Sequence, residues 1–348
     1  MKAKLSVMKI RGIYTFLSIF GVIFLYSCQQ QQAQQKEEVD PLPSWNTTVI
    51  KNSILSYVEK SAQIIPVEDR IAVFDMDGTV ACEAPLWFEM YIAVHGLNQQ
   101  SSKNPALLNE PEYQFAQKLA VNPVDKWVAD HWVTSSANYI DSMIWKAYAG
   151  TYHEAYVDSA RSYLSRTKDQ KFGMPLSDMF YQPMIELIQY LTENQFSVYI
   201  VSGSIQGVIW SVCPQTIGLD RDHLIGTRQI LTPVYASDGH KTRFVIRKGI
   251  FQPKNDKNGK SLNIYAHIGK VPVFAFGNTS GDFGMFHLAS GSPYPNMELL
   301  LNHDDSIREY AYPPYHGKPV PAWQDSLIQN NWKQVDMSEE FKTVWMTK

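Results

Sequence analysis

The sequence predicts an α/β protein: a parallel sheet with helices on both faces, and a separate helical domain inserted after the first strand. Three observations predict it. Short apolar runs alternate with amphipathic segments of helical period, the pattern of repeated strand–helix units. The apolar runs stay apolar almost to their ends, as in central parallel strands covered on both faces. After the first run, residues 83–179 show mostly helical patterns and few β-branched stretches.

The composition is that of a globular chain without a strongly charged surface. The chain has 348 residues, of which 45% are hydrophobic and 19% are charged, and its formal net charge is −3. This balance excludes a largely disordered chain, and the length suits one large domain or two ordinary ones. Because no long basic run follows the N-terminus, we expect no nucleic-acid partner.

Residues 1–28 have the pattern of an export signal. The basic stretch MKAKLSVMKIRG precedes the apolar run IYTFLSIFGVIFLYSC, which is short for a membrane span. The final LYSC resembles the processing site of bacterial lipoproteins, in which Cys28 would become the lipidated first residue. An uncleaved transmembrane anchor is the alternative. The polar, low-complexity residues 29–44 then form a disordered tether, so we expect lipid anchoring at a bilayer of the bacterial cell envelope, facing the periplasm or the cell surface.

The folded part is expected to be a core of residues 45–82 and 180–348, interrupted by the insertion 83–179. The core begins with SWNTTVIKNSILSYVEKSAQ, whose Asn/Thr start and apolar spacing predict a helix. The first strand, RIAVFDMD, follows it. Within the insertion, the abundant Trp, Tyr, Met and Ala predict two or three amphipathic helices.

Strands and helices alternate again from about residue 180. Helices are expected at SDMFYQPMIELIQYLTENQ, IQGVIWSVCP, KSLNIYAHIG, TSGDFGMFHLAS and SEEFKTVW. Strands are expected at FSVYIVSGS, HLIGTRQIL, VPVFAFGN and MELLLNHDD, with a loop-rich stretch after the second of these. Processing at Cys28 leaves Cys82 and Cys213, which we expect to be free buried thiols; one disulfide is the alternative.

Polar side chains stand at the ends of four expected strands: Asp75 and Asp77, Ser202, Asn278 and Asp282, and His303–Asp305. In parallel sheets of this kind, ligands bind beyond the carboxyl ends of the strands. The four ends therefore predict one polar rim. His303–Asp305 could reach that rim or form a solvated loop paired with Arg308.

These motifs together resemble the haloacid dehalogenase-like superfamily, chiefly its phosphatases. The match comprises DMDGT after one strand, Ser202 after a second, a lysine, and G-N-xxx-D after a third. It extends over the whole mature chain and is closest to the phosphoserine-phosphatase-like branch. The runs GKSLNIYAHIGKVPVFAFGNTSGD and HDDSIREYAY are similar to a less characterised group of bacterial members. The resemblance implies a Rossmann-like core with an early-inserted helical cap.

The resemblance also implies chemical roles. Asp75 would attack phosphorus and form an aspartyl-phosphate, and Asp77 would protonate the leaving alcohol and then activate water. Ser202, the Gly203 amide and a lysine would bind the phosphoryl group. Thr79 would contribute to this phosphate site and could orient Asp77.

Two positions require a choice. Five lysines precede the Gly-Asn turn of the last motif, and we choose Lys260 because NGK leads straight into a helix; Lys257 is second. The metal would be Mg²⁺, which prefers oxygen ligands, held by Asp75, the backbone carbonyl of Asp77, Asn278 and Asp282. Asn278 stands where the family usually has an acid, so the site has less negative charge.

The start of the insertion bears on the substrate. Glu83 lies within about one position of the glutamate with which phosphoserine phosphatases bind the substrate ammonium group. With Trp87 it suits an amine-bearing ester such as phosphoserine or phosphocholine. The alternative is that Trp87, Phe88 and Tyr91 form the core face of a helix.

We therefore expect a Mg²⁺-dependent phosphomonoesterase acting on a small soluble phosphate ester. Two rivals remain. Another reaction of the superfamily is one, although dehalogenases lack the second aspartate, Asp77. The other is a non-catalytic envelope lipoprotein that binds a phosphorylated ligand, its site weakened by Asn278.

Overall fold

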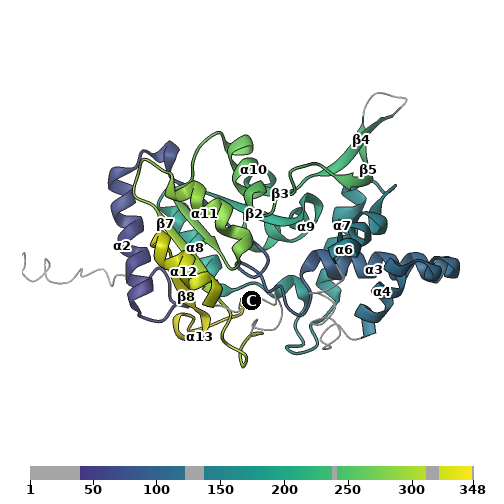
Figure 1. Cartoon of the computed structure of the whole chain (residues 1–348), viewed down its shortest axis with the longest axis horizontal. Helices are drawn as coiled ribbons and strands as arrows, with labels where there is room; N and C mark the ends of the chain where they lie inside the picture. The colour runs from purple at the N-terminus through teal and green to yellow at the C-terminus, as the bar shows by residue number, and fades with distance from the viewer. Residues whose placement is uncertain (1–39, 122–136, 237–240, 311–320, 347–348) are drawn as a thin grey trace, which may run out of the picture. The chain divides into compact units, whose positions relative to one another are not determined.

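The fold is built around one parallel sheet, and a computed structural model describes it for residues 40–121, 137–236, 241–310 and 321–346. Six strands lie in the order β3-β2-β1-β6-β7-β8, and every neighbouring pair is parallel. Figure 1 labels β2, β3, β7 and β8 of this sheet. Their bounds are β1 (Ile71–Phe74), β2 (Ser197–Ile205), β3 (Leu224–Thr227), β6 (Phe274–Gly277), β7 (Met297–Asn302) and β8 (Lys333–Asp336). Strand order reverses beside β1, so this strand lies at the position where such sheets bind ligands.

Alternation along the strands gives the sheet two buried faces, as the apolar runs predicted. In β1, Ala72 and Phe74 pack into one core cluster, and Ile71 and Val73 pack into another. The first cluster contains residues of α2 (Val49–Ile64), α8 (Gln182–Glu193) and α9 (Gln206–Ile217). The second contains residues of α10 (Asn258–Ile268), α11 (Phe283–Ser290) and α12 (Pro321–Asn330).

The helical insertion follows β1. It contains α3 (Phe88–Lys103), α4 (Pro111–Val121), α6 (Ala137–Tyr148) and α7 (His153–Arg166). Short 3₁₀ helices also occur: η1 (Val67–Asp69), η2 (Pro105–Asn109), η3 (Leu176–Asp178), η4 (Arg221–His223) and η5 (Ser280–Asp282). The helix α3 packs against α4 and α6, and the buried residues of these helices belong to the same core cluster as Ala72 and Phe74 of β1.

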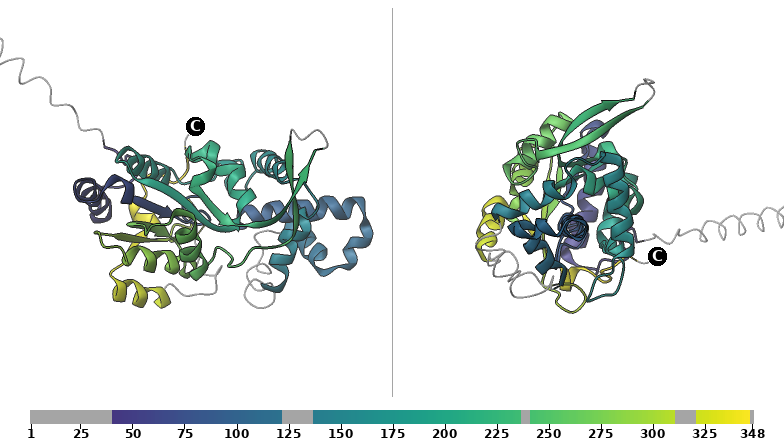
Figure 2. Two further views of the ribbon diagram at one scale, coloured as in Figure 1. Left: turned by 90° about the horizontal axis from the view of Figure 1, so that it is seen from above. Right: turned by 90° about the vertical axis from the view of Figure 1, so that its right-hand side faces the viewer.

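The stretch expected to be loop-rich contains an antiparallel hairpin, β4 (Gln229–Tyr235) and β5 (Thr242–Ile250). The hairpin packs on α6 and α7, where Ile246 exchanges backbone hydrogen bonds with Gly150 (2.8 Å) and Thr151 (2.9 Å) (Figure 2). These residues were expected in the core segment 180–348, but β5 packs against the helices α6 and α7 of the insertion. A two-stranded hairpin is marginal alone, and this one gains its partners from helices distant in sequence.

Three further expectations need correction or extension at the chain ends. Leu42 is fully buried and the amide of Ser44 donates to Glu186 Oε2 (2.8 Å), so the tether ends before residue 44. Strand β8 was not expected, and only one helical turn, α13 (Met337–Glu340), follows it. Cys28 and residues 29–39 lie outside the described residues. In the part that is described, no helix has the length and apolarity needed to cross a bilayer.

Both cysteines of the folded part are free and buried, as expected. The Sγ of Cys213 lies 3.6 Å from Sδ of Met76, and Sγ of Cys82 donates to Oε1 of Glu309 (3.0 Å). The two thiols therefore have different partners in the core.

Candidate active site

The loop after β1 has a backbone path that only glycine can follow at its centre. The amide of Asp75 still donates to the carbonyl of Phe276 (2.9 Å), and the chain then turns so that the amide of Gly78 donates to the carbonyl of Ala81 (2.7 Å). Gly78 has φ +78°, and an added Cβ would lie 1.9 Å from Nδ2 of Asn278. A side chain at position 78 would therefore strain the backbone and collide with the loop after β6.

Asp75, Lys260 and Asp282 form a buried ionic cluster. The Nζ of Lys260 lies 2.6 Å from Oδ1 of each carboxylate, and the side chains are 3%, 10% and 2% exposed for Lys260, Asp75 and Asp282. Burial raises the pKa of Asp75 well above its usual value, the charge of Asp282 raises it further, and Lys260 opposes both. Burial by itself lowers the pKa of Lys260, but the two carboxylates outweigh it and the pKa is raised.

The loop between β6 and α11 holds Asp282 in place. Its Oδ2 accepts from the amides of Asn278 (2.9 Å) and Thr279 (3.0 Å), which leaves Oδ1 directed at Lys260. The Thr279 hydroxyl in turn accepts from the amide of Gly281 (3.1 Å) and completes a capping box. This orientation comes from local turn chemistry.

The carboxylate of Asp77 points to the end of β2. Its Oδ2 accepts from the hydroxyls of Ser202 (3.1 Å) and Ser204 (2.8 Å), whereas Oδ1 is buried without a hydrogen-bond partner among the described residues. Burial raises the pKa of Asp77 to about 7, against the hydrogen bond from Ser204. An acid with this pKa holds a proton near neutrality and can also release it. Thr79 is buried, and its hydroxyl forms no hydrogen bond within the described structure, so it does not orient Asp77.

Two groups that support this end of β2, Ser204 and Asn255, were not predicted from the sequence. Ser204 follows Ser202 by two residues in VSGS, and its position on the same side of the strand was a usable signal. Asn255 is fully buried, and its Nδ2 donates to the carbonyls of Ser202 and Ile225 (both 2.8 Å). No local pattern marks Asn255. The carbonyl of Gly203 accepts from the hydroxyl of Thr227 (2.7 Å).

The donors around Asn278 fit a hard cation. Its Nδ2 donates to Oε1 of Glu83 (2.7 Å), and its Oδ1 is buried with no hydrogen-bond partner in the described ranges. Two carboxylates, Asp75 and Asp282, share the single ammonium group of Lys260 nearby. Amide and carboxylate oxygens are ligands that suit Mg²⁺. Among the described residues, His, Cys, Asp and Glu alone form no cluster of three or more that could hold a metal. A metal here would need Asn278, backbone carbonyls or water in addition.

A cavity of about 250 Å³ opens beside Gly203. It is lined by Glu89, Asp141, Ile144, Trp145, Gly203, Ile205, Thr227, Gly249, Ile250, Gln252 and Lys254. Buried Glu89 accepts from the amide of Ile205 (2.8 Å), and Lys254 donates to Asp141 (2.9 Å). Of the two substrate residues expected from sequence, neither lines this cavity: Trp87 donates to Glu89 (3.3 Å), and Glu83 accepts from Asn278.

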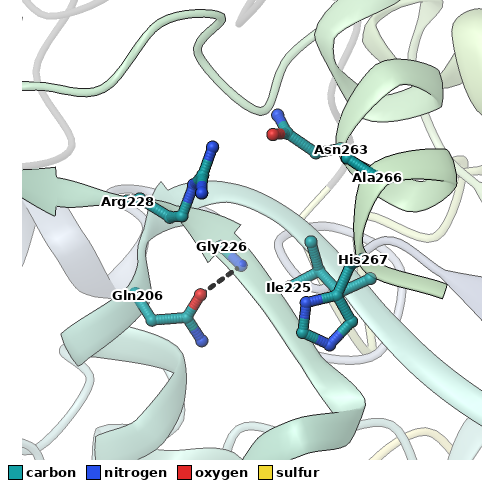
Figure 3. A pocket seen from close by; sticks show the side chains of 7 residues that line it. All are labelled: Gln206, Ile225, Gly226, Arg228, Asn263, Ala266 and His267. Carbon is teal, nitrogen blue, oxygen red and sulfur yellow. Dashed lines mark hydrogen bonds between the residues drawn. The ribbon is translucent and has the colours of Figure 1, made fainter.

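A smaller hollow, of about 100 Å³, lies between β3 and α10 (Figure 3). It is lined by Gln206, Ile225, Gly226, Arg228, Asn263, Ala266 and His267. Gln206 accepts from the amide of Gly226 (2.9 Å), as Figure 3 shows. It also donates to the carbonyl of Leu224 (2.6 Å). The side-chain amide of Gln206 therefore joins α9 to β3. We assign no chemical function to this hollow.

The polar residues after β7 have different positions. The ring of His303 is buried against the loop that follows β1, residues 75–81, which we call the catalytic loop. Its Nε2 lies 2.6 Å from the carbonyl oxygen of Gly78. Asp304 accepts from the amide of Ser338 (2.8 Å), and Asp305 pairs with Arg308. Of these three residues, His303 contacts the catalytic loop. Asp305 pairs with Arg308 as the alternative expected, but it is buried rather than solvated.

Comparisons with solved structures found matches of low sequence identity. Solved structures with similar folds include a phosphoserine phosphohydrolase-like protein of Francisella tularensis (14% identity, TM-score 0.36, covering 74% of this chain and 99% of that one). Another is a probable phosphoserine phosphatase of Vibrio cholerae (11% identity, TM-score 0.36, covering 80% of this chain and 75% of that one). A third is cytosolic 5'-nucleotidase IIIB bound to cytidine (13% identity, TM-score 0.43, covering 83% of this chain and 86% of that one). Similarity at this level does not indicate what the chain hydrolyses, and no curated protein sequence matches it.

A match to a protein-family profile assigns the chain to a family. The profile of the haloacid dehalogenase-like hydrolases matches residues 72–287, more than half of the chain. The matched segment runs from β1 to α11 and includes Asp75, Lys260 and Asp282. The chain therefore belongs to the haloacid dehalogenase-like hydrolase family.

Proposed function

We propose that this hydrolase is a Mg²⁺-dependent phosphomonoesterase that acts on a small, amine-bearing phosphate ester through an aspartyl-phosphate. The observation that carries the proposal is the separation of the two aspartates of DMDGT. Asp75 lies with Lys260 and Asp282, whereas Asp77 lies with Ser202 and Ser204 and has a pKa of about 7. A nucleophile must be ionised and a general acid must hold a proton. The ammonium group of Lys260 favours an ionised Asp75, against burial and the charge of Asp282, which raise the pKa of Asp75. Asp77, with a pKa of about 7, can hold the proton that a general acid needs.

In the first step, an Oδ atom of Asp75 attacks phosphorus as the bond from phosphorus to the ester oxygen breaks. Protonated Asp77 gives its proton to that oxygen, so the alcohol leaves neutral. Lys260 neutralises charge on the phosphoryl oxygens, while Ser202 and the Gly203 amide hold them. Asp75 becomes an acyl phosphate and Asp77 a carboxylate.

In the second step, the carboxylate of Asp77 takes a proton from water as the water oxygen attacks phosphorus. The bond from phosphorus to Asp75 breaks, which releases inorganic phosphate and restores both acids to their starting states. Asp75, Asp282, Asn278 and the backbone carbonyl of Asp77 would hold Mg²⁺. When bound, this ion supplies positive charge for the developing phosphoryl charge.

The cavity beside Gly203 supports an amine on the leaving alcohol. Glu89 and Asp141 bring two carboxylates to the cavity, against one ammonium group from Lys254, and Trp145 adds an aromatic wall. Glu83 also lies near Asp77, whose pKa its charge raises. A protonated amine would be attracted by these carboxylates and by the ring face.

The direct test is hydrolysis by the purified protein of p-nitrophenyl phosphate and of a panel of phosphate monoesters, with and without Mg²⁺. Wild type should release phosphate only with the metal, and Asp75→Asn should lose activity. Phosphoserine, phosphoethanolamine and phosphocholine should have higher kcat/KM than sugar phosphates of similar size. Equal values would remove the amine from the proposal and leave the phosphatase.

A second candidate follows from Asn278, which gives the site less charge than an acid would. The chain would then bind a phosphorylated ligand without turning it over. Tight binding of phosphate esters without phosphate release, across several divalent ions, would favour this binder.

We also propose that Cys28 carries the lipid anchor that holds the protein at a bilayer of the cell envelope; loss of membrane association in Cys28→Ala would support it.

A further inference from the structure

The carbonyl of Gly78 is held by a residue from a distant strand end. The Nε2 of His303 lies 2.6 Å from this oxygen and must donate to it, because a carbonyl can only accept. His303 follows β7, two strands from β1 in the sheet, and is 4% exposed. The bond therefore crosses from β7 to the catalytic loop inside the protein.

The histidine is itself fixed from behind. Its Nδ1 lies 3.1 Å from Oε2 of Glu309, whose other oxygen accepts from the hydroxyl of Tyr181 and the thiol of Cys82, both at 3.0 Å. Glu309 is fully buried. A proton lies between Nδ1 and Oε2, since both atoms cannot act as acceptors at this distance. The ring can turn away from Gly78 only by breaking this bond as well.

The space beside the Cα of Gly78 is also filled. A Cβ at position 78 would lie 1.9 Å from Nδ2 of Asn278 and 2.5 Å from Oε1 of Glu83, so these side chains pack directly on the glycine. Gly78 is thus held at its carbonyl oxygen by His303 and enclosed at its Cα by Asn278 and Glu83. Asp77 is bonded covalently to this glycine, so its position depends on the same contacts.

We propose that His303, held by Glu309, is a positioning residue that directs the carboxyl group of Asp77 toward the leaving oxygen. His303 acts through the Gly78 carbonyl and has no contact with substrate. The inference rests on the proposed function and extends it, because it names what aligns the general acid. A shift of about 1 Å in a catalytic group can cost about 100-fold in rate.

A misdirected acid has a signature that general damage lacks. An alkyl alcohol leaves poorly without a proton, whereas p-nitrophenolate leaves without one. Loss of alignment should therefore slow cleavage of an alkyl phosphate much more than cleavage of p-nitrophenyl phosphate. The first turnover must be measured, because Asp77 also acts in hydrolysis of the aspartyl-phosphate and can limit later turnovers.

The test compares His303→Ala, His303→Gln and wild type in the full chain at saturating Mg²⁺. Rapid-quench release of ethanolamine from phosphoethanolamine and of p-nitrophenol from its phosphate gives two first-turnover rates. In His303→Ala we expect the rate of ethanolamine release to fall about 100-fold and the rate of p-nitrophenol release to fall less than about 5-fold. His303→Gln should recover much of the first rate, since its amide can donate to Gly78.

His153→Ala is the matched control, because His153 is also 4% exposed and hydrogen-bonds Gln229 rather than the catalytic loop. It should leave the ratio of the two rates unchanged, even if it lowers the thermal midpoint. If His303→Ala does not fold, Glu309→Ala and Glu309→Gln decide instead. Glu309→Ala should change the ratio of the two first-turnover rates. Glu309→Gln should preserve this ratio, because its side-chain amide can donate to Nδ1 of His303.

Equal losses for both esters, or no loss for either, would overturn the positioning role while the phosphatase stands. Hydrolysis of neither ester by the wild-type protein would overturn the phosphatase and the positioning role together.

Discussion

The ammonium group of Lys260 bridges Asp75 and Asp282 at 2.6 Å, although Asp75 lies 185 residues away in sequence. The bridge joins the loop after β1, the first turn of α10 and the loop after β6. Because three elements meet there, the ionic contact contributes both to folding at the carboxyl ends of the central strands and to neutralising the carboxylates of the site.

Lys260→Met should therefore weaken both folding and activity. The change leaves two buried carboxylates without a cation, and breaking a buried pair in this way costs roughly 3–5 kcal/mol. Urea unfolding without metal should show this loss, and kcat/KM should fall at least about 100-fold. Lys257→Met is the control, because Lys257 is exposed and three residues away. Equal losses in the two variants would contradict the assignment.

The pH dependence should report Asp77. Its pKa of about 7 means that the proton needed in the first step is present below neutrality and is lost as pH rises. We expect kcat/KM for phosphoethanolamine to fall about tenfold per pH unit well above pH 7. Asp77→Asn should remove this limb together with most of the activity. A flat profile up to pH 9 would exclude Asp77 as the acid.

Asn278 is matched to Glu83, and replacing it with the acid usual in the family should reveal the match. In Asn278→Asp, two carboxylates would face each other at the present 2.7 Å contact. We expect a lower thermal midpoint without metal and tighter Mg²⁺ binding, since the ion regains a charged ligand. Adding Glu83→Gln should restore the midpoint. A double variant no more stable than the single one would show that repulsion by Glu83 is not the cause.

Glu298 predicts a pH effect on stability away from the site. It lies on β7, and burial raises its pKa to about 7, while Ser290 opposes the shift. The folded state then keeps a proton that the unfolded state has released, so the free energy of unfolding should fall as pH rises from about 4.5 to about 7. One such group contributes at most about 1.4 kcal/mol per pH unit. Glu298→Gln should reduce the slope measured by urea unfolding, and an unchanged slope would reject the assignment.

Much of the architecture follows from local patterns. The parallel sheet and the helices on both of its faces were predicted because period, apolar content and capping residues reflect local physics. The N-terminal Thr48 cap of α2, whose hydroxyl accepts from the amide of Lys51, is of this kind. Hairpin β4–β5 was missed although its strands have seven and nine residues, because the helices on which it packs lie far away in sequence. Strand β8 was missed because its four residues, KQVD, are mostly polar.

The sequence by itself determined that acids and hydroxyls would end the central strands, and that these strands would be parallel. Only the tertiary structure decided which of those groups meet. Strand order and register bring Lys260 rather than Lys257 to Asp75, add Ser204 to Asp77, and place His303 on Gly78. The physical reason is that a side chain's identity and local backbone are encoded within a few residues. Its partner across the sheet depends on how every intervening element packs.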